Sequence, residues 1–197
     1  MKTINLNRLF IALLFVLLSI GGFAAEYTVD KKSSTVNWTG KKVTGKHFGK
    51  IYFESGELNV KNNRIVGGSF IMDMTSFTVD DLDEGKWHDM LYNHLRSDDF
   101  FSVDKHKTST LELTSVRTKD GKNYQFTGNL VIKEISHPVQ FNAQVDLNRS
   151  ILKAEGQIVI DRTLYGMRFN SGKFFVNLGD KLVYDEFTLD FQLVAKK

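Results

Sequence analysis

The chain has 197 residues, of which 42% are hydrophobic, with 26 basic and 23 acidic side chains and no cysteine. This length suits one domain, at most two, and the hydrophobic content is high enough for a core, which excludes a disordered chain. The lack of cysteine excludes disulfides, thiolate metal sites, a cysteine nucleophile and a lipid anchor on an N-terminal cysteine.

Residues 1–25 have the pattern of a secretory signal peptide. Lys2 and Arg8 are the only charged residues before position 26, an apolar run covers residues 9–20, and small residues close the segment. A basic start, a short apolar stretch and small residues at the end are typical of a signal peptide. The run is short for a membrane span, which needs about 20 apolar residues.

A signal peptide at this position predicts that the rest of the chain is exported and forms the mature protein. The small side chains predict cleavage after Ala24 or Ala25. We expect residues 26–197 to form one domain in the periplasm or outside the cell, with no integral membrane span. Losing Lys2 and Arg8 lowers the basic count from 26 to 24 against 23 acidic residues, so net charge gives no reason to expect a nucleic-acid partner.

Most of the remaining sequence alternates between apolar and polar residues. Side chains along a strand point to opposite faces in turn, so each alternating run predicts a strand with one buried face. Turn-forming pairs such as Asn62-Asn63 and Asp120-Gly121 separate the runs, because Asn, Asp and Gly tolerate the positive φ of tight hairpin turns. Eight strands are predicted, over residues 34–39, 50–60, 64–74, 109–117, 122–133, 138–147, 151–160 and 184–195.

Consecutive strands joined by short turns predict an antiparallel meander. Eight such strands can close into a barrel, which removes the exposed edges of the sheet. The expected fold is therefore all-β, an eight-stranded antiparallel barrel, with a short helical insertion near residues 83–101. The apolar stripe of that helix, which we expect to cap one mouth of the barrel, consists of Trp87, Met90, Leu91, His94 and Leu95.

The sequence contains no strong signature of catalysis or metal binding. The five His are scattered along the chain, whereas a zinc site needs three or four converging ligands. Neither a Gly-x-Ser-x-Gly elbow nor a glycine-rich phosphate loop is present. We therefore expect a protein that is not an enzyme, with no catalytic residue and no metal site.

The apolar faces of the predicted strands form the candidate binding surface. Phe is abundant, with 16 residues, and many of them lie on these faces. An eight-stranded barrel either packs such side chains into a core or keeps room for one small apolar ligand, and the pattern leaves both open. The residues expected to face the interior and to contact such a ligand are Phe126, Leu130, Ile132, Phe141, Val145, Ile158, Phe187, Leu189 and Phe191.

Five motifs, in this order and spacing, resemble the YceI-like family across nearly the full length that follows the signal segment. Each motif alone is weak, and their combination is specific. One departure is Lys105-His106-Lys107, where the family often has Tyr-Pro. The motifs lie at residues 27–38, 43–49, 91–101, 128–139 and 161–167.

The resemblance implies a lipocalin-like barrel, periplasmic or secreted, that holds a long polyisoprenoid lipid of the isoprenoid-quinone or polyprenyl-phosphate type in its interior. A bound isoprenoid lipid is expected, and no other cofactor. A charged or quinone head group would need polar partners at the mouth, and Arg162 and Arg168 are candidates because Arg binds phosphate oxygens bidentately. Structural pairing, for instance of Arg162 with a strand-end carboxylate, is the alternative and favoured interpretation.

Two other classes of protein stay open. Alternation does not say which face lies inside, so the strands also fit a small outer-membrane β-barrel. An accessory protein or enzyme that acts on a bound isoprenoid quinone is the second alternative. A homodimer stays open as well.

Overall fold

The computed structural model describes residues 24–197, so the predicted signal peptide and its cleavage site lie almost wholly outside the described residues. Within the described part, no helix is long and apolar enough to cross a membrane. Residues 24–197 form nine strands, one α-helix and two short 3-10 turns: β1 Ala25–Val29, β2 Thr35–Lys42, β3 Gly45–Lys61, β4 Arg64–Asp73, α1 Lys86–Arg96, β5 Thr108–Thr118, β6 Asn123–Ile132, β7 Ile135–Asn148, β8 Ile151–Asp161, η1 Arg162–Tyr165, η2 Gly179–Lys181 and β9 Val183–Lys196.

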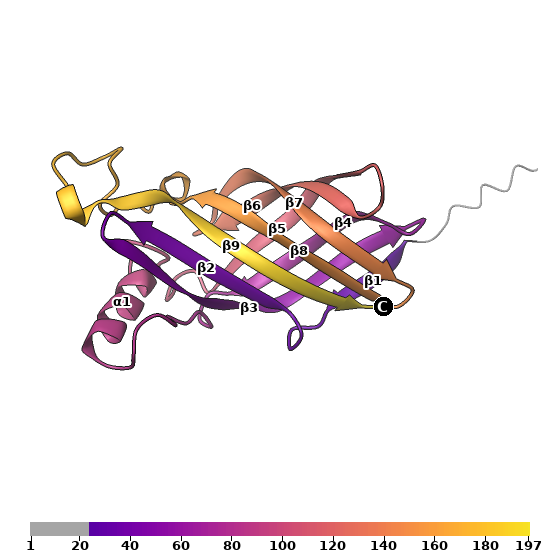
Figure 1. Ribbon diagram of the computed structural model, residues 1–197, viewed down its shortest axis with the longest axis horizontal. Coiled ribbons are helices and arrows are strands. Elements are labelled where there is room, and N and C mark those ends of the chain that lie inside the picture. The colour runs from indigo at the N-terminus through magenta and orange to yellow at the C-terminus, as the bar shows by residue number, and fades with distance from the viewer. Residues whose placement is uncertain (1–23) are drawn as a thin grey trace, which may run out of the picture.

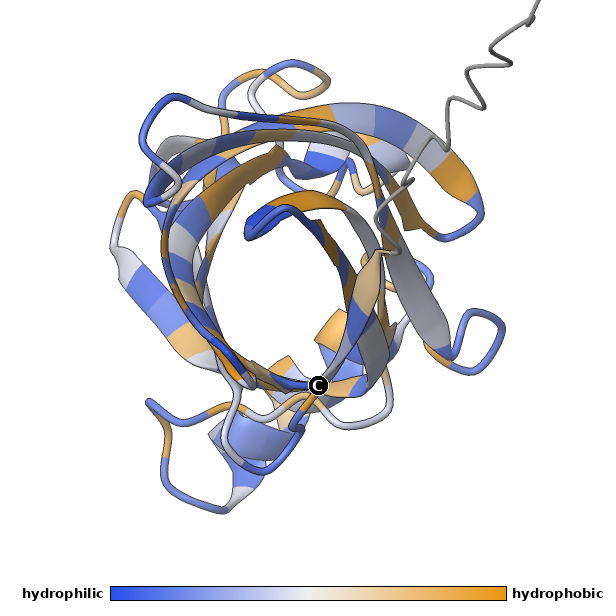
Figure 2. Cartoon of the chain, turned by 90° about the vertical axis from the view of Figure 1, so that its right-hand side faces the viewer, coloured by the Kyte–Doolittle hydropathy of each residue, from blue (hydrophilic) through white to orange (hydrophobic). Residues whose placement is uncertain are grey.

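Eight of the strands close into an antiparallel barrel, which confirms the predicted fold class. Going around the barrel, the neighbours are β3, β2, β9, β8, β7, β6, β5 and β4, and β4 then pairs with β3. The closed ring is visible when the barrel is viewed along its axis (Figure 2). Every strand is therefore hydrogen-bonded on both sides for at least part of its length, and the sheet needs no protected edge.

The short strand β1 is an addition to the predicted set. It pairs with β3 through Tyr27↔Leu58 and with β9 through Val29↔Ala195, which is the same pair of neighbours that β2 has further along the barrel. Strands β1 and β2 thus occupy one position in the ring, interrupted by the turn at residues 30–34. This interruption explains why the alternating pattern predicted β2 but not the short strand β1.

Strands β7 and β8 separate at one end of the barrel. Their pairing runs from Asn148↔Ile151 to Asn142↔Gln157, although β7 begins at Ile135 and β8 ends at Asp161. The 3-10 turn η1 lies beside this part of β7, where His137 Nε2 is 3.0 Å from the carbonyl oxygen of Leu164. The separation also accommodates Pro138 inside β7, because a residue without a strand partner on that side needs no N–H there.

The helical insertion lies at the same end of the barrel as the β7–β8 separation (Figure 1). Tyr92 of α1 packs against Phe77, with ring centroids 5.1 Å apart, and Phe101 packs against Phe187 of β9 at 6.3 Å. The predicted stripe is correct in period but partly wrong in phase, since Trp87 and Met90 are exposed while Tyr92 and Leu95 pack on the core. Packing against the barrel determines which side of the helix is covered.

The inner and outer faces of the barrel differ sharply in polarity. Most of the large apolar side chains of the strands point inward and form a single core cluster. On the outside, one row of directly paired positions crosses five strands, and all five of its residues are exposed: Asn37, Asp190, Gln157, Asn142 and Gln125. The barrel therefore has an apolar interior and a polar exterior.

Candidate functional site

A cavity in the middle of the barrel is the candidate site. Its volume is about 100 Å³. Among the described residues that line it, all are apolar except Ser109 and Thr110 of β5. Strands β2 to β9 all contribute side chains, so closure of the barrel creates the cavity and no local segment contains it.

Six of the nine apolar residues proposed from the sequence line this cavity: Phe126, Leu130, Phe141, Ile158, Leu189 and Phe191. Ile132, Val145 and Phe187 also point into the barrel, but they belong to the packed core beyond the cavity walls. Phe187 lies under the helical insertion, against Phe101. Alternation places all nine on the inner face, while their height along the barrel decides which of them border open space.

Three phenylalanines from three strands form one wall of the cavity. The Phe126 and Phe141 rings are stacked with centroids 5.3 Å apart, and Phe191 meets Phe141 edge to face at 5.9 Å. Such aromatic pairs contribute about 0.5–1.5 kcal/mol each beyond the burial of their area. The wall is therefore well defined, and it presents ring faces and edges to the cavity.

The opposite wall was missing from the residues proposed on sequence grounds. It comes from strands β2 to β5. The corresponding strands were predicted at residues 34–39, 50–60, 64–74 and 109–117, but their inward faces were not assigned to a site. The same period-two signal was available there, since Phe70 and Met72, for example, are two positions apart. The residues are Val36, Phe53, Leu58, Ile65, Phe70, Met72, Leu111 and Leu113.

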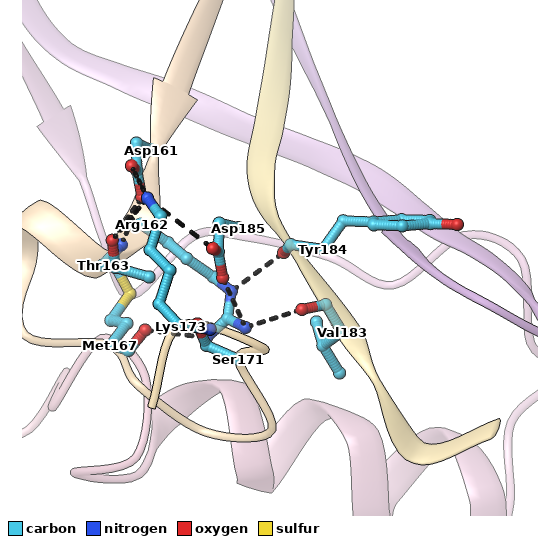
Figure 3. A network of polar contacts seen from close by, with 9 residues as sticks. All are labelled: Asp161, Arg162, Thr163, Met167, Ser171, Lys173, Val183, Tyr184 and Asp185. Atoms are coloured by element: carbon cyan, nitrogen blue, oxygen red, sulfur yellow. Dashed lines mark hydrogen bonds and ion pairs between the residues drawn. The ribbon is translucent and has the colours of Figure 1, made fainter. Parts of the chain in front are cut away.

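Arg162, at the start of η1, is buried, with 4% of its surface exposed. Its guanidinium donates hydrogen bonds to three backbone carbonyls: Nη1 to Met167 at 2.7 Å, Nε to Tyr184 at 3.0 Å and Nη2 to Val183 at 3.0 Å (Figure 3). These contacts join the two ends of the segment between η1 and β9. Arg162 therefore holds this segment in place, and its donors are directed at the backbone.

A carboxylate also faces the Arg162 guanidinium, as the favoured structural interpretation expected. Asp185 Oδ1 lies 3.7 Å from Arg162 Nη2, and Lys173 Nζ lies 2.6 Å from Asp161 Oδ2 and 3.6 Å from Asp185 Oδ2. Burial lowers the pKa of Arg162, and the nearby Asp185 and Asp161 oppose that shift. Two acidic and two basic side chains thus balance each other at this point.

Arg168, the second head-group candidate, lies in a different environment. It is exposed, and its guanidinium carbon lies 4.7 Å from the ring centroid of Phe174. Neither Arg162 nor Arg168 is among the residues that line the cavity. The structure therefore brings six of the nine apolar candidates together in one site and places the two arginines outside it.

Comparisons with known proteins agree with this architecture. The model of the YceI-like domain matches residues 27–195. A UPF0312 protein of Ectopseudomonas mendocina is 29% identical over 137 residues, covering 64% of this chain and 65% of that protein. A UPF0312 protein of Pectobacterium carotovorum is 42% identical over 52 residues, which is 26% of this chain and 27% of the relative, so the matched parts span less than two thirds of these curated relatives.

Two solved structures share the fold over nearly their whole length. Burkholderia cenocepacia BcnA has a TM-score of 0.68 and 22% identity, covering 85% of this chain and 99% of that chain. A domain from Saccharophagus degradans, described as a polyisoprenoid binding domain implicated in plant cell wall breakdown, has a TM-score of 0.59 and 14% identity, covering 86% and 97%. At these identities the similarity shows the barrel architecture.

Proposed function

This chain belongs to the YceI-like family, and on that premise we propose that it binds the hydrocarbon chain of a long polyisoprenoid lipid inside the barrel. The observation that carries the proposal is the wall of the central cavity, whose surface is entirely apolar although Ser109 and Thr110 belong to its lining. Such a wall offers dispersion contacts and burial of apolar area, and these are the interactions that an isoprenoid chain can make. The fold shared with the Saccharophagus domain supports the same ligand class.

The energetics favour a long chain over a short one. Burying one CH₂ group gains about 0.8 kcal/mol, while association costs about 4–15 kcal/mol in lost freedom of motion. Roughly 5–20 buried carbons are therefore needed before binding becomes favourable. A single five-carbon unit lies at the lower limit, so we propose a ligand of several isoprene units.

The cavity must widen to hold such a chain. Its volume of about 100 Å³ is below the roughly 300–1,000 Å³ of typical small-molecule sites. The walls contain side chains that can change rotamer, among them Met72, Leu111 and Phe191. We propose that the ligand enters by displacing these side chains along the barrel axis.

The polarity of the wall bears on the head group. Ser109 and Thr110 belong to the lining but present no polar surface to the cavity, and no residue of the wall carries a charge that could pair with a phosphate. The Arg162 donors are directed at three carbonyls. We therefore propose that a neutral quinone head can enter the cavity, whereas a phosphate head stays in water outside it.

The outer surface supports a barrel surrounded by water. A barrel that spans a membrane has an apolar outer band about 25 Å tall. Here the paired row across the middle of five strands carries amides and a carboxylate, such as Asn142, Gln157 and Asp190. This polarity does not support the outer-membrane alternative. We propose binding and transport of the lipid in the periplasm or outside the cell, without catalysis.

Mass spectrometry of an organic extract of the purified protein tests the proposal. We expect a polyisoprenoid lipid in the extract, or saturable binding of an added isoprenoid quinone. Replacing Ala154, which lines the cavity, by Leu should reduce binding at least tenfold, because the added carbons occupy the space of the ligand. The matched control is Gln157→Leu on the outer face of the same strand, which should bind like the wild type.

Two results would contradict the proposal. One is a protein that yields no lipid on extraction and binds no added isoprenoid. The other is lipid binding that survives Ala154→Leu unchanged, which would place the ligand outside the barrel. Fractionation and N-terminal sequencing of the exported protein test the proposed location and the cleavage after Ala24 or Ala25.

A further inference from the structure

The segment of residues 168–182, here called the tip loop, projects from the barrel end that also carries α1 (Figure 1). At its centre Phe174, Phe175 and Val176 are 45%, 49% and 85% exposed. Single exposed apolar side chains are common on proteins, but three consecutive ones at the end of a projection are unusual unless they serve an interaction. The tip loop thus presents an apolar surface that the barrel does not cover.

This exposure is built into the loop by specific contacts. Arg162 binds the carbonyls of Met167 before the loop and of Val183 after it. Lys173 binds Asp161 of β8, and the amides of Phe174 and Phe175 both donate to the carbonyl of Ser171 at its tight turn. The base is therefore anchored while the apolar side chains point away from the barrel.

A fourth exposed apolar residue lies next to the tip loop. Val43, in the turn between β2 and β3, is exposed, and its amide donates to the carbonyl of Leu182 at 3.2 Å. The two segments 41–46 and 168–182 therefore form one surface.

Basic side chains outnumber acidic ones on this surface. Six basic side chains lie in the two segments, and Asp180 is the acidic one. The surface hollow that Lys41 borders adds Asp161, Asp185 and Glu186, so the acids number four, and two of them, Asp161 and Asp185, pair with Lys173. Among the described residues, Lys173 is the one member of the six that forms an ion pair. The basic residues are Lys41, Lys42, Lys46, Arg168, Lys173 and Lys181.

The opposite end of the barrel provides an internal comparison. Its turns are also rich in basic residues, with Lys61, Arg64, Lys119 and Lys122 among them. The exposed large apolar residues near that end, among those the structure describes, are Val66 and Ile151, which are far apart in sequence. Positive charge is thus shared by both ends, while the consecutive apolar tip is confined to one.

From these observations we propose that the tip loop docks the protein on an anionic lipid bilayer. Apolar side chains on a projection bury themselves at the boundary between head groups and acyl chains, and flanking Lys and Arg side chains are attracted to anionic lipids. Phe174, Phe175 and Val176 would enter the interface, with Lys42 and Lys181 at its rim. The proposal does not depend on which ligand the barrel holds.

Docking in this orientation also brings the β7–β8 separation close to the bilayer. The tip loop follows directly after η1, which lies beside the unpaired end of β7, and Leu164 of η1 is exposed. Resting on the proposed function, we infer that the lipid ligand exchanges with the membrane at this end of the barrel.

Vesicle flotation tests the docking surface. The probes are vesicles of phosphatidylethanolamine mixed with phosphatidylglycerol, compared with vesicles of phosphatidylcholine alone. We expect the wild type to float with the anionic vesicles and at least tenfold less with the neutral ones. Replacing Phe175 and Val176 together by Ser should lower binding to anionic vesicles about tenfold or more. The matched control replaces Val66 and Ile151 by Ser and should bind like the wild type.

Charge is tested in the same assay. Lys42→Glu with Lys181→Glu should weaken binding to anionic vesicles at least tenfold, whereas Lys119→Glu with Lys122→Glu at the opposite end should not. Thermal unfolding verifies that each variant is folded. Because the substituted side chains are exposed, except for the half-buried Lys42, we expect melting temperatures close to that of the wild type.

Three results would overturn the proposal. The first is a wild-type protein that binds neither kind of vesicle. The second is equal binding by the Phe175/Val176 variant and its control, which would mean that general positive charge holds the protein on the vesicles. The third is a wild-type dimer that the Phe175/Val176 variant turns into a monomer without any change in vesicle binding, which would make a second copy of the chain the occupant of the surface. Lipid extraction is scored separately, so failure of docking and failure of ligand binding are distinguishable.

Discussion

Arg162→Met separates a structural role of this arginine from a role in ligand binding. The side chain is 4% exposed and donates to three backbone carbonyls at 2.7–3.0 Å. A methionine of similar length fills the space but leaves the carbonyls of Met167, Val183 and Tyr184 without these donors, and it leaves Asp185 facing an apolar side chain. The substitution therefore removes hydrogen bonds and a charge pair while it changes packing little.

The expected destabilisation follows from these contacts. Removing one partner of a buried, hydrogen-bonded charge pair costs about 3–5 kcal/mol. In a domain of this size, 1 kcal/mol shifts the melting temperature by about 2–4 °C. We therefore expect Arg162→Met to melt roughly 6–20 °C below the wild type.

The matched control is Arg168→Met, six residues further along the chain. Arg168 is exposed, and its main contact is the Phe174 ring at 4.7 Å, an interaction worth about 0.5–1 kcal/mol. Thermal unfolding followed by circular dichroism should show a loss of about 1–4 °C for this variant. Arg162→Lys should fall between the two, because an ammonium group lacks the planar fork of donors.

The reasoning would be refuted if Arg162→Met melted within the range expected for Arg168→Met. A different failure is equally informative: unchanged stability together with loss of bound lipid would make Arg162 a ligand contact after all. The melting curve and the lipid extract of the same preparation therefore decide between the two interpretations.

Two further predictions concern the faces of the barrel and the pH dependence of stability. Phe141→Asp and Leu189→Asp each place an unpaired carboxylate against the cavity and should destabilise the barrel by several kcal/mol. The control Asn142→Asp, on the outer face beside Phe141, should melt close to the wild type. Wild-type melting of both interior variants would mean that the faces are reversed. The hydrogen bond from Lys196, with help from Ser33, lowers the pKa of Asp30 to about 2. Because the folded pKa lies below the unfolded value of about 3.9, this ion pair stabilises the fold above pH 4 and loses its contribution as the pH falls toward 2. The difference in melting temperature between the wild type and Asp30→Asn should therefore shrink over that range. The control Asp146→Asn, on the outer surface, should melt like the wild type throughout. A difference for Asp30→Asn that stays constant down to pH 2 would contradict the stabilising role of the Asp30–Lys196 pair.

The barrel and the polarity of its two faces were predictable from the sequence. Alternation is a local property, because the pleat sends neighbouring side chains to opposite faces wherever a strand forms. It therefore placed Phe126, Phe141 and Phe191 on the apolar faces of their strands without any knowledge of their partners, and the structure shows that these faces point inward. The turn residues Asn62 and Asn63 also gave the hairpin position directly, since both adopt positive φ.

Only the tertiary structure decided what depends on residues distant in the sequence. Periodicity found α1, but the position of the barrel determines that Tyr92 is covered and Trp87 is exposed. The cavity exists because strands from both halves of the chain close around it, and no single strand shows how much space remains between its neighbours. The sequence favoured a carboxylate partner for Arg162, but it gave no sign of the backbone carbonyls that accept its hydrogen bonds, two of which lie more than twenty residues away. Local geometry thus determined the faces, while long-range packing determined which residues border the cavity and which cations remain available.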